Sequence, residues 1–180
     1  SDDGRFVVFA SRAALVPSDT RLCTVPPETT PGNCQDVYLR DRQTNETLRL
    51  SVAAAGAEAD GPSSSPRITG NGRYVVFVSA AANLVPDDTN GVADIFLLDR
   101  QTGIVRVSRS TTGDQADLAA AKPSISDDGN VIAFLSASTT LSAESDPTRC
   151  LDVGTGCWRP FLHDRVSGVT RRLPLPPSHA

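Results

Sequence analysis

One short pattern occurs three times in the sequence. Residues 1–9 (SDDGRFVVF) recur as residues 69–77 (TGNGRYVVF) and again as residues 126–134 (SDDGNVIAF). Each copy places a glycine-containing turn before an apolar run. A tandem repeat of this kind predicts one supersecondary unit stacked on copies of itself. The repeat therefore constrains the fold strongly, but it says little about function, because one scaffold can host many functions.

The second copy shows the plan of the unit most clearly. Residues 66–69 predict a short strand, residues 73–79 a β-rich run, residues 94–99 a third strand and residues 104–108 a fourth. Turn residues separate the strands, which predicts an antiparallel meander. The composition agrees, because 5% aromatic residues, 13 Gly and 13 Pro suit many short strands better than a helical bundle.

The repeated motifs resemble those of a known family. They read Pro-x-Ile-Ser-Asp-Asp-Gly, then an apolar strand that ends in Phe, then Asp-(Ile/Val)-(Phe/Tyr)-Leu, then Asp-Arg-x-x-Gly. This series resembles the TolB-like, WD-type β-propeller repeat and covers nearly the whole chain. Two departures are Gly70-Asn71-Gly72, which replaces the usual Asp-Gly turn, and Arg159, which replaces the Asp that begins the third strand.

The resemblance implies four-stranded blades packed radially around a channel. We expect an all-β fold: a partial β-propeller of about three antiparallel meander blades, in one propeller region, residues 1–180. The repeat units are approximately 1–60, 61–118 and 119–180. The first copy lacks its innermost strand, which predicts three, four and four strands. Propellers typically contain four to eight blades, so we expect a fragment of a larger propeller, or closure by self-association.

The cysteines form two pairs, each within one inter-strand loop. Cys23 and Cys34 lie in the loop of the first unit, and Cys150 and Cys157 lie in the equivalent loop of the third. Two local disulfides are predicted. The alternative is zinc, which would need the pairs to converge, and neither pair has the tight Cys-x-x-Cys spacing. Disulfides indicate an oxidising compartment, so the expected location is periplasmic, cell-surface or secreted.

The net charge of the chain and its few potential catalytic residues argue against several functions. A net charge of −4 and a pI near 5.1 argue against nucleic acid as a partner. The sequence contains no apolar run of the ~20 residues that span a bilayer. Only His163 and His179 could serve as imidazole bases, and no Gly-x-Ser-x-Gly motif accompanies them. The sequence therefore predicts neither an enzyme nor a catalytic cofactor.

An antiparallel meander sends alternate connections to opposite ends of each blade. The short turns are expected at one end, and the long loops and crossovers at the other. Binding residues concentrate on variable loops that a rigid scaffold positions. Arg21, Asp87 and Trp158 are the candidate binding residues on the long-loop face, with a protein, peptide or glycan as the expected partner.

One loop could bind a metal ion. Asp88, Asn90 and Asp94 offer oxygen ligands at alternate positions around Gly91, a pattern that suits calcium. The loop lacks a bidentate Glu, and the alternative is a polar turn in which Asn-Gly supplies a positive φ.

The Asp-Arg pair recurs in every unit, as Asp41-Arg42, Asp99-Arg100 and Asp164-Arg165. We interpret these pairs as structural, because an Asp at a hairpin bend caps backbone N–H groups and a binding site is not expected in every blade.

Three functional hypotheses follow. The first is a non-catalytic exported binding scaffold. The second, implied by the resemblance, is a substrate-gating propeller of a prolyl-oligopeptidase-like hydrolase whose catalytic domain lies outside this chain. The third is a calcium-stabilised surface module.

Overall fold

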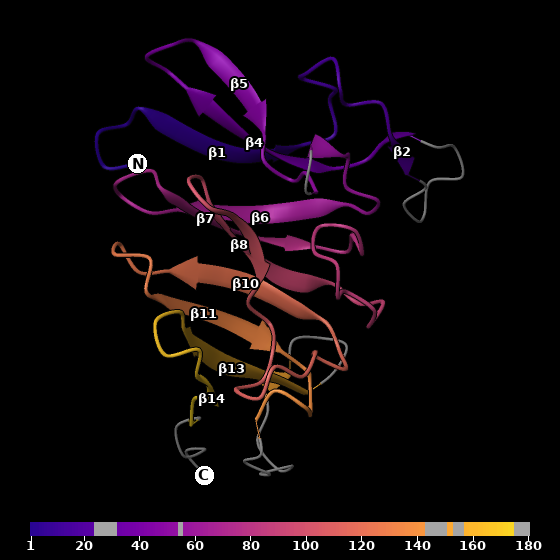
Figure 1. Ribbon diagram of the computed structural model, residues 1–180, viewed down its shortest axis with the longest axis vertical. Coiled ribbons are helices and arrows are strands. Elements are labelled where there is room, and N and C mark those ends of the chain that lie inside the picture. Colours follow the sequence, from indigo (N-terminus) through magenta and orange to yellow (C-terminus); the bar gives the residue numbers. More distant parts are fainter. Residues whose placement is uncertain (24–31, 54–55, 143–150, 153–156, 175–180) are drawn as a thin grey trace.

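The computed structural model describes residues 1–23, 32–53, 56–142, 151–152 and 157–174. The chain forms three main antiparallel sheets that follow one another along the long axis of the molecule (Figure 1). We name them blades 1 to 3 in chain order. Within the described residues the fold is all-β, as the repeat predicts.

Each blade is a meander of neighbouring strands. Blade 1 contains β1 (Phe6–Ser11), β4 (Asp36–Asp41) and β5 (Glu46–Arg49). Blade 2 contains β6 (Ser63–Ile68), β7 (Tyr74–Ser79), β8 (Asp94–Asp99) and β9 (Gly103–Arg106). Blade 3 contains β10 (Ala120–Ile125), β11 (Val131–Ser136), β13 (Cys157–Asp164) and β14 (Thr170–Arg172), with β12 (Leu151–Asp152) paired to the start of β13.

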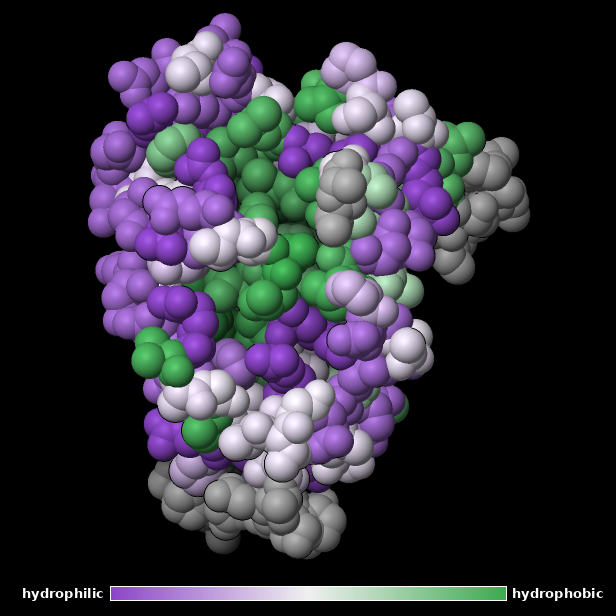
Figure 2. Space-filling model, viewed as in Figure 1, coloured by the Kyte–Doolittle hydropathy of each residue, from purple (hydrophilic) through white to green (hydrophobic). Residues whose placement is uncertain are grey.

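Blade 1 has no counterpart of the inner strands β6 and β10, which confirms the prediction from its incomplete repeat. Hydrophobic side chains gather in a hollow that lies over β1 and β6 in the orientation of Figure 1 (Figure 2). None of the side chains of β1 is buried, whereas the closely similar strand β7 is buried at five of its six positions. The difference in burial arises from missing neighbours, because the two sequences are nearly the same.

The apolar faces of the blades form two cores. Alternate residues of a strand point to opposite faces of its sheet, and the two faces of blade 2 pack against different blades. Val75, Phe77 and Phe96 belong to the core between blades 1 and 2. Val76 and Leu97 belong to the core between blades 2 and 3.

A repeated contact joins each blade to the next. The ring of Phe6 lies against Gly72 of blade 2, where an added Cβ would stand 2.4 Å from a ring carbon. The guanidinium of Arg100 lies 4.3 Å from the centre of the same ring. Tyr74 makes the same contact with Gly129 and Arg165 of blade 3. Since a cation over an aromatic face is attracted to it, we call this arrangement the ring clamp.

The connections divide between two ends of the blades, as expected. Short turns lie at one end, near the N-terminus, and the long connections lie at the other (Figure 1). The long loop of blade 1 also contains a small hairpin of β2 (Leu22–Cys23) and β3 (Gly32–Asn33), which was not predicted.

Two predicted strand boundaries were wrong by two residues or more. β6 begins at Ser63 rather than Pro66, because a bulge at Ser65, where φ is 55°, lets the strand continue past the proline. β9 ends at Arg106 rather than Ser108. Beyond it the Val107 N–H still donates to the Ile95 carbonyl of β8, and the Ser108 hydroxyl accepts from the Ile95 N–H.

Candidate functional site: the long-loop face

A buried arginine holds the long loop of blade 1 in place. Arg49, at the end of β5, donates from Nη1 to Glu58 at 2.8 Å and from Nη2 to the Ser18 carbonyl at 2.9 Å. Its Nη1 also lies 3.6 Å from a carboxylate oxygen of Asp19 and 3.7 Å from one of Asp36. These residues come from four separate segments: the loop after β1, the start of β4, the end of β5 and the crossover to blade 2. We call them the Arg49 centre.

Blade 2 repeats this arrangement around Arg106. Its Nη1 donates to Asp88 at 3.0 Å and to Gln115 at 2.8 Å, and its Nη2 donates to the Asp87 carbonyl at 3.1 Å. Asp94 lies 3.8 Å from Nη1. The two loops are therefore fixed by the same means, with Gln115 in the place of Glu58.

The pKa values of the carboxyl groups in these centres do not all shift in the same direction. Burial raises the pKa of Asp36 and of Asp94 above the usual range, although Ser51 and Ser108 donate hydrogen bonds to them. Glu58 is half-buried, and burial alone would raise its pKa. Hydrogen bonds from the backbone N–H of Arg21 and from other donors outweigh this effect, so the pKa of Glu58 is lowered.

Blade 1 contains the one group of carboxylates in the described residues that could hold a metal ion, Asp19, Asp36 and Glu58. Nη1 of Arg49 lies within 4 Å of an oxygen of each of them. The guanidinium thus supplies the positive charge among these carboxylates.

The three residues of the predicted calcium loop do come together. The amide Nδ2 of Asn90 donates to Asp94 at 2.7 Å, and Asp88 pairs with Arg106. Burial and the nearby Asp94 raise the pKa of Asp88. The loop is therefore connected without a metal, and calcium binding here stays a prediction.

The candidate binding residues lie in different settings. Arg21 and Asp87 are exposed, and their backbones are held by the two centres: the Arg21 N–H donates to Glu58 at 2.9 Å, and the Asp87 carbonyl accepts from Arg106. Trp158 was expected on a loop, but it lies within β13, half-buried and paired with Leu151. This prediction failed because β13 extends outward as a hairpin with β12.

One of the two predicted disulfides is present, Cys23–Cys34, which links β2 to the residue that follows β3. Cys150 lies outside the described residues, so the pairing of Cys150 with Cys157 stays a prediction.

The Asp-Arg turns serve the structure, as predicted. Asp41 and Asp99 accept paired hydrogen bonds from Arg5 and Arg73. His163 is buried and shares a hydrogen bond of 2.9 Å with Thr170. Burial lowers its pKa.

Sequence reasoning missed the two arginines that organise this face. A signal was present: residues 15–20 (LVPSDT) match residues 84–89 (LVPDDT), and Arg-x-Ser recurs at Arg49 and Arg106. In both units the Glu or Gln follows the arginine by nine residues. A search for repeats beyond the strands would have found this group.

Comparison with solved structures shows the fold. The chain superposes on a TolB-type protein of Agrobacterium tumefaciens with a TM-score of 0.53 and 19% identity, over 96% of this chain and 46% of that one. The propeller domain of the Trilobed protease of Pyrococcus furiosus matches with a TM-score of 0.50 and 10% identity, over 97% and 41%. The acylaminoacyl peptidase of Pyrococcus horikoshii matches with a TM-score of 0.50 and 11% identity, over 97% and 24%.

These likenesses identify the architecture as part of a β-propeller. The chain spans less than half the length of each of these three chains. No protein-family model and no curated protein matches the sequence. Among the described residues, no helix is long and apolar enough to cross a membrane.

Proposed function

Because the chain forms part of a β-propeller, we propose that it is a non-catalytic, exported binding scaffold whose long-loop face takes a protein, peptide or glycan. The observation that supports this most directly is the anchoring of the long loops by Arg49 and Arg106. Each arginine fixes the backbone beneath an exposed, variable segment. Such loops are where scaffolds usually carry recognition.

Anchoring favours binding for an energetic reason. Ordering a loop at the moment of association costs conformational entropy, and a loop held beforehand avoids much of that cost. Arg21 and Asp87 project from backbone that is already hydrogen-bonded to buried groups. They can therefore present a positive and a negative charge at fixed positions.

Export is supported by the Cys23–Cys34 disulfide in the same loop, since such bonds persist mainly in oxidising compartments. The bond also joins β2 to the residue that follows β3, and so closes the hairpin next to Arg21.

The proposal can be tested with glycan arrays and a displayed peptide library. The 180-residue chain is screened beside the double variant Arg21→Ala/Asp87→Ala. The matched control is Gln101→Ala, an exposed change at the short-turn end of blade 2. We expect a ligand whose binding the double variant loses and the control keeps, with unchanged thermal melts. A ligand that binds all three proteins equally would contradict the assignment to the long-loop face.

A second candidate is the substrate-gating propeller of a prolyl-oligopeptidase-like hydrolase. Its support is the likeness to the propeller domain of the Trilobed protease and to the acylaminoacyl peptidase. In that case the catalytic residues lie elsewhere in a longer polypeptide. Sequencing the gene around this segment distinguishes the two, because the gating function requires a Gly-x-Ser-x-Gly motif and later Asp and His residues.

A further inference from the structure

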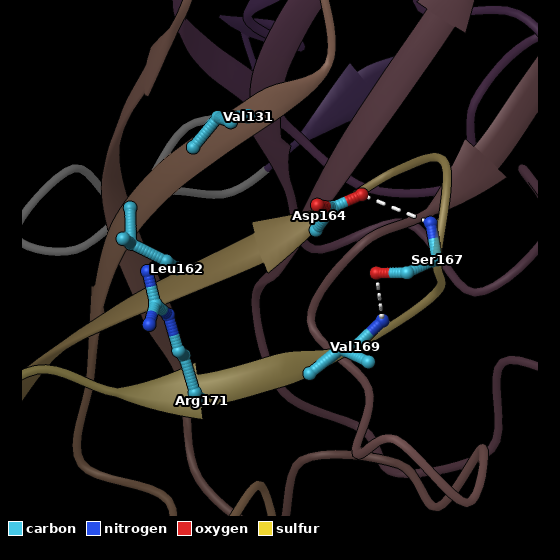
Figure 3. A pocket seen from close by; sticks show the side chains of 6 residues that line it. All are labelled: Val131, Leu162, Asp164, Ser167, Val169 and Arg171. Carbon is cyan, nitrogen blue, oxygen red and sulfur yellow. Dashed lines mark hydrogen bonds between the residues drawn. The ribbon is translucent and has the colours of Figure 1, made fainter.

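The face of blade 3 that points away from blade 2 contains a groove. Figure 3 shows its lining, with Asp164 and Ser167 at the turn between β13 and β14 and the other residues along the strands. The lining residues are Val131, Leu162, Asp164, Ser167, Val169 and Arg171.

The groove has a counterpart between blades 2 and 3. Tyr74 pairs with Asp99 in blade 2 as Val131 pairs with Asp164 in blade 3. The pairing of β13 with β14 matches that of β8 with β9 in the same way. Each residue that lines the groove on blade 3 therefore has an equivalent in the second groove. In the order given above, the equivalents are Tyr74, Leu97, Asp99, Thr102, Gly103 and Val105. The groove on blade 3 is therefore one half of a junction that the chain already makes once.

In the complete junction, the next blade supplies the other wall. His163, Arg165 and Gly168 of blade 3 line the groove against blade 2. They lie in and beside the Asp-Arg turn of blade 3, and Arg165 stacks on the Tyr74 ring at 4.7 Å. A blade that covered the outward face of blade 3 would present the same three positions.

Blade 1 carries these three positions on its own free side. Arg40 and Arg42 flank Asp41 as His163 and Arg165 flank Asp164, and Asn45 has the positive φ of Gly168, 62° against 73°. Arg42 and Asn45 are exposed. Blade 1 therefore offers the wall that blade 3 lacks.

One exposed apolar residue on the free side of blade 1 matches positions that are interior in the other blades. Val7 pairs with Arg40 on this side and is 45% exposed. The equivalent residues Val75 and Ile132 are each 0% exposed, because they pack against a preceding blade.

The turn aspartate of blade 3 is open to a charge pairing, although Arg171 adds a positive charge to the same groove. In blades 1 and 2 the turn aspartate is matched by an arginine of its own sheet, at Arg5 and Arg73. In blade 3 that position is Asn130, and the Asp164 carboxylate accepts from the N–H groups of Val166 and Ser167, with no arginine paired to it among the described residues. Asp164 can therefore accept an arginine from outside, and the free side of blade 1 offers Arg42.

We propose that the groove on blade 3 binds the Asp41–Asn45 turn of blade 1 from a second copy of this chain. Each copy has one groove and one such turn, so a two-fold pair makes both contacts at once. Arg42 then lies beside Asp164, over the smaller Val131 that takes the place of Tyr74. In this dimer, blade 3 of one copy would contact blade 1 of the other in the way that blade 2 contacts blade 3 within the chain. This proposal does not depend on the proposed binding function.

The test is the mass of the 180-residue chain in solution, by analytical ultracentrifugation over a wide range of concentration. We expect a dimer of twice the 19.0 kDa mass of one chain. Arg42→Glu and Asp164→Arg should each weaken the dimer by about tenfold or more, because each places like charges together. Arg67→Glu, the same charge change at an exposed site on β6, should leave the dimer intact.

An equimolar mixture of the two single variants gives the sharpest result. At one junction of its heterodimer the introduced glutamate faces the introduced arginine, and at the other the original pair is kept, so dimerisation should return. Thermal melts verify that both variants are folded. A monomer at every concentration overturns the proposal, and so does a dimer that ignores both changes or a mixture that fails to recover. A monomer would leave a further blade of a longer polypeptide as the occupant of the groove.

Discussion

The phenol hydroxyl of Tyr38 donates a hydrogen bond to the Oδ2 oxygen of Asp19, and this bond ties the loop after β1 to β4. Both residues are buried. The equivalent of Tyr38 in blade 2 is Phe96, which has no such donor. The loop of blade 1 is therefore held by a contact that the repeat itself does not require.

Replacing this tyrosine tests the tether. Tyr38→Phe leaves Asp19 with a buried oxygen that has lost its donor, which typically costs about 1–3 kcal/mol. We expect that loss in the free energy of urea unfolding. Tyr74→Phe is the control, because the Tyr74 hydroxyl makes no hydrogen bond within the described residues. Equal losses in both variants would count against the tether.

Removing the arginine of the Arg49 centre should be more damaging. Its side chain is 3% exposed, and Arg49→Gln leaves Asp19 and Asp36 as buried charges without their cation. Losses of about 3–5 kcal/mol are usual when one partner of a buried ion pair is removed. Urea unfolding measures the change, with the exposed Arg67→Gln as the control. A loss no larger than the control's would show that the centre contributes little to stability.

The ring clamp predicts a steric effect at Gly129. A Cβ added there would lie 2.3 Å from a ring carbon of Tyr74, and φ is +72°. Gly168 has nearly the same φ, +73°, with open space around it. Gly168→Ala should cost about 1 kcal/mol from the backbone alone, and Gly129→Ala should lower the melting temperature considerably more. If the two variants melt alike, the clamp does not pack as described.

The turn aspartate of blade 2 predicts a dependence on pH. Hydrogen bonds from Arg73 hold the pKa of Asp99 well below its usual range. Because the folded value is below the unfolded one, the stabilisation is fully present above about pH 4 and is lost as the pH falls further. Asp99→Asn should reduce stability at pH 7 and flatten this loss, as followed by urea unfolding at several pH values. Asp164→Asn, where no arginine is paired among the described residues, should change the profile less.

A thermal melt tests whether the loop binds calcium. Asp88 is already paired with Arg106, so we expect neither calcium nor a chelator to shift the melting temperature. A ligand that binds the folded state raises it. A rise with calcium that Asp94→Asn abolishes would assign the ion to the predicted loop.

Much of the fold was predictable because the repeat carries its own strand pattern. The short turns before Phe6, Tyr74 and Val131 mark where one strand of each blade begins, and the missing inner strand of blade 1 follows from the same alignment. The start of β6 was not predictable, since a proline ordinarily interrupts a strand and only the positive φ at Ser65 carries the strand past it.

The site was harder to predict because its parts are distant in sequence. Arg49 and Asp19 are brought together by the meander, and an arginine at a strand end usually faces solvent. Trp158 was misplaced because nothing in its sequence distinguishes a loop from a strand that continues as a hairpin. Arg21 and Asp87 do lie exposed on long loops, since loop length alone locates this end of the blades, and their part in binding stays a prediction.

The ring clamp gives the array of blades a direction. At each contact between blades, one blade contributes the aromatic ring and the next contributes the turn glycine and its arginine. A blade can therefore follow another in only one orientation. Blade 2 carries both halves, and a duplicate of it would find a fitting neighbour on either side. Blade 3 accepts a ring but offers Val131 instead of one. Internal duplication is therefore the route by which such an array could lengthen without redesigning its joints.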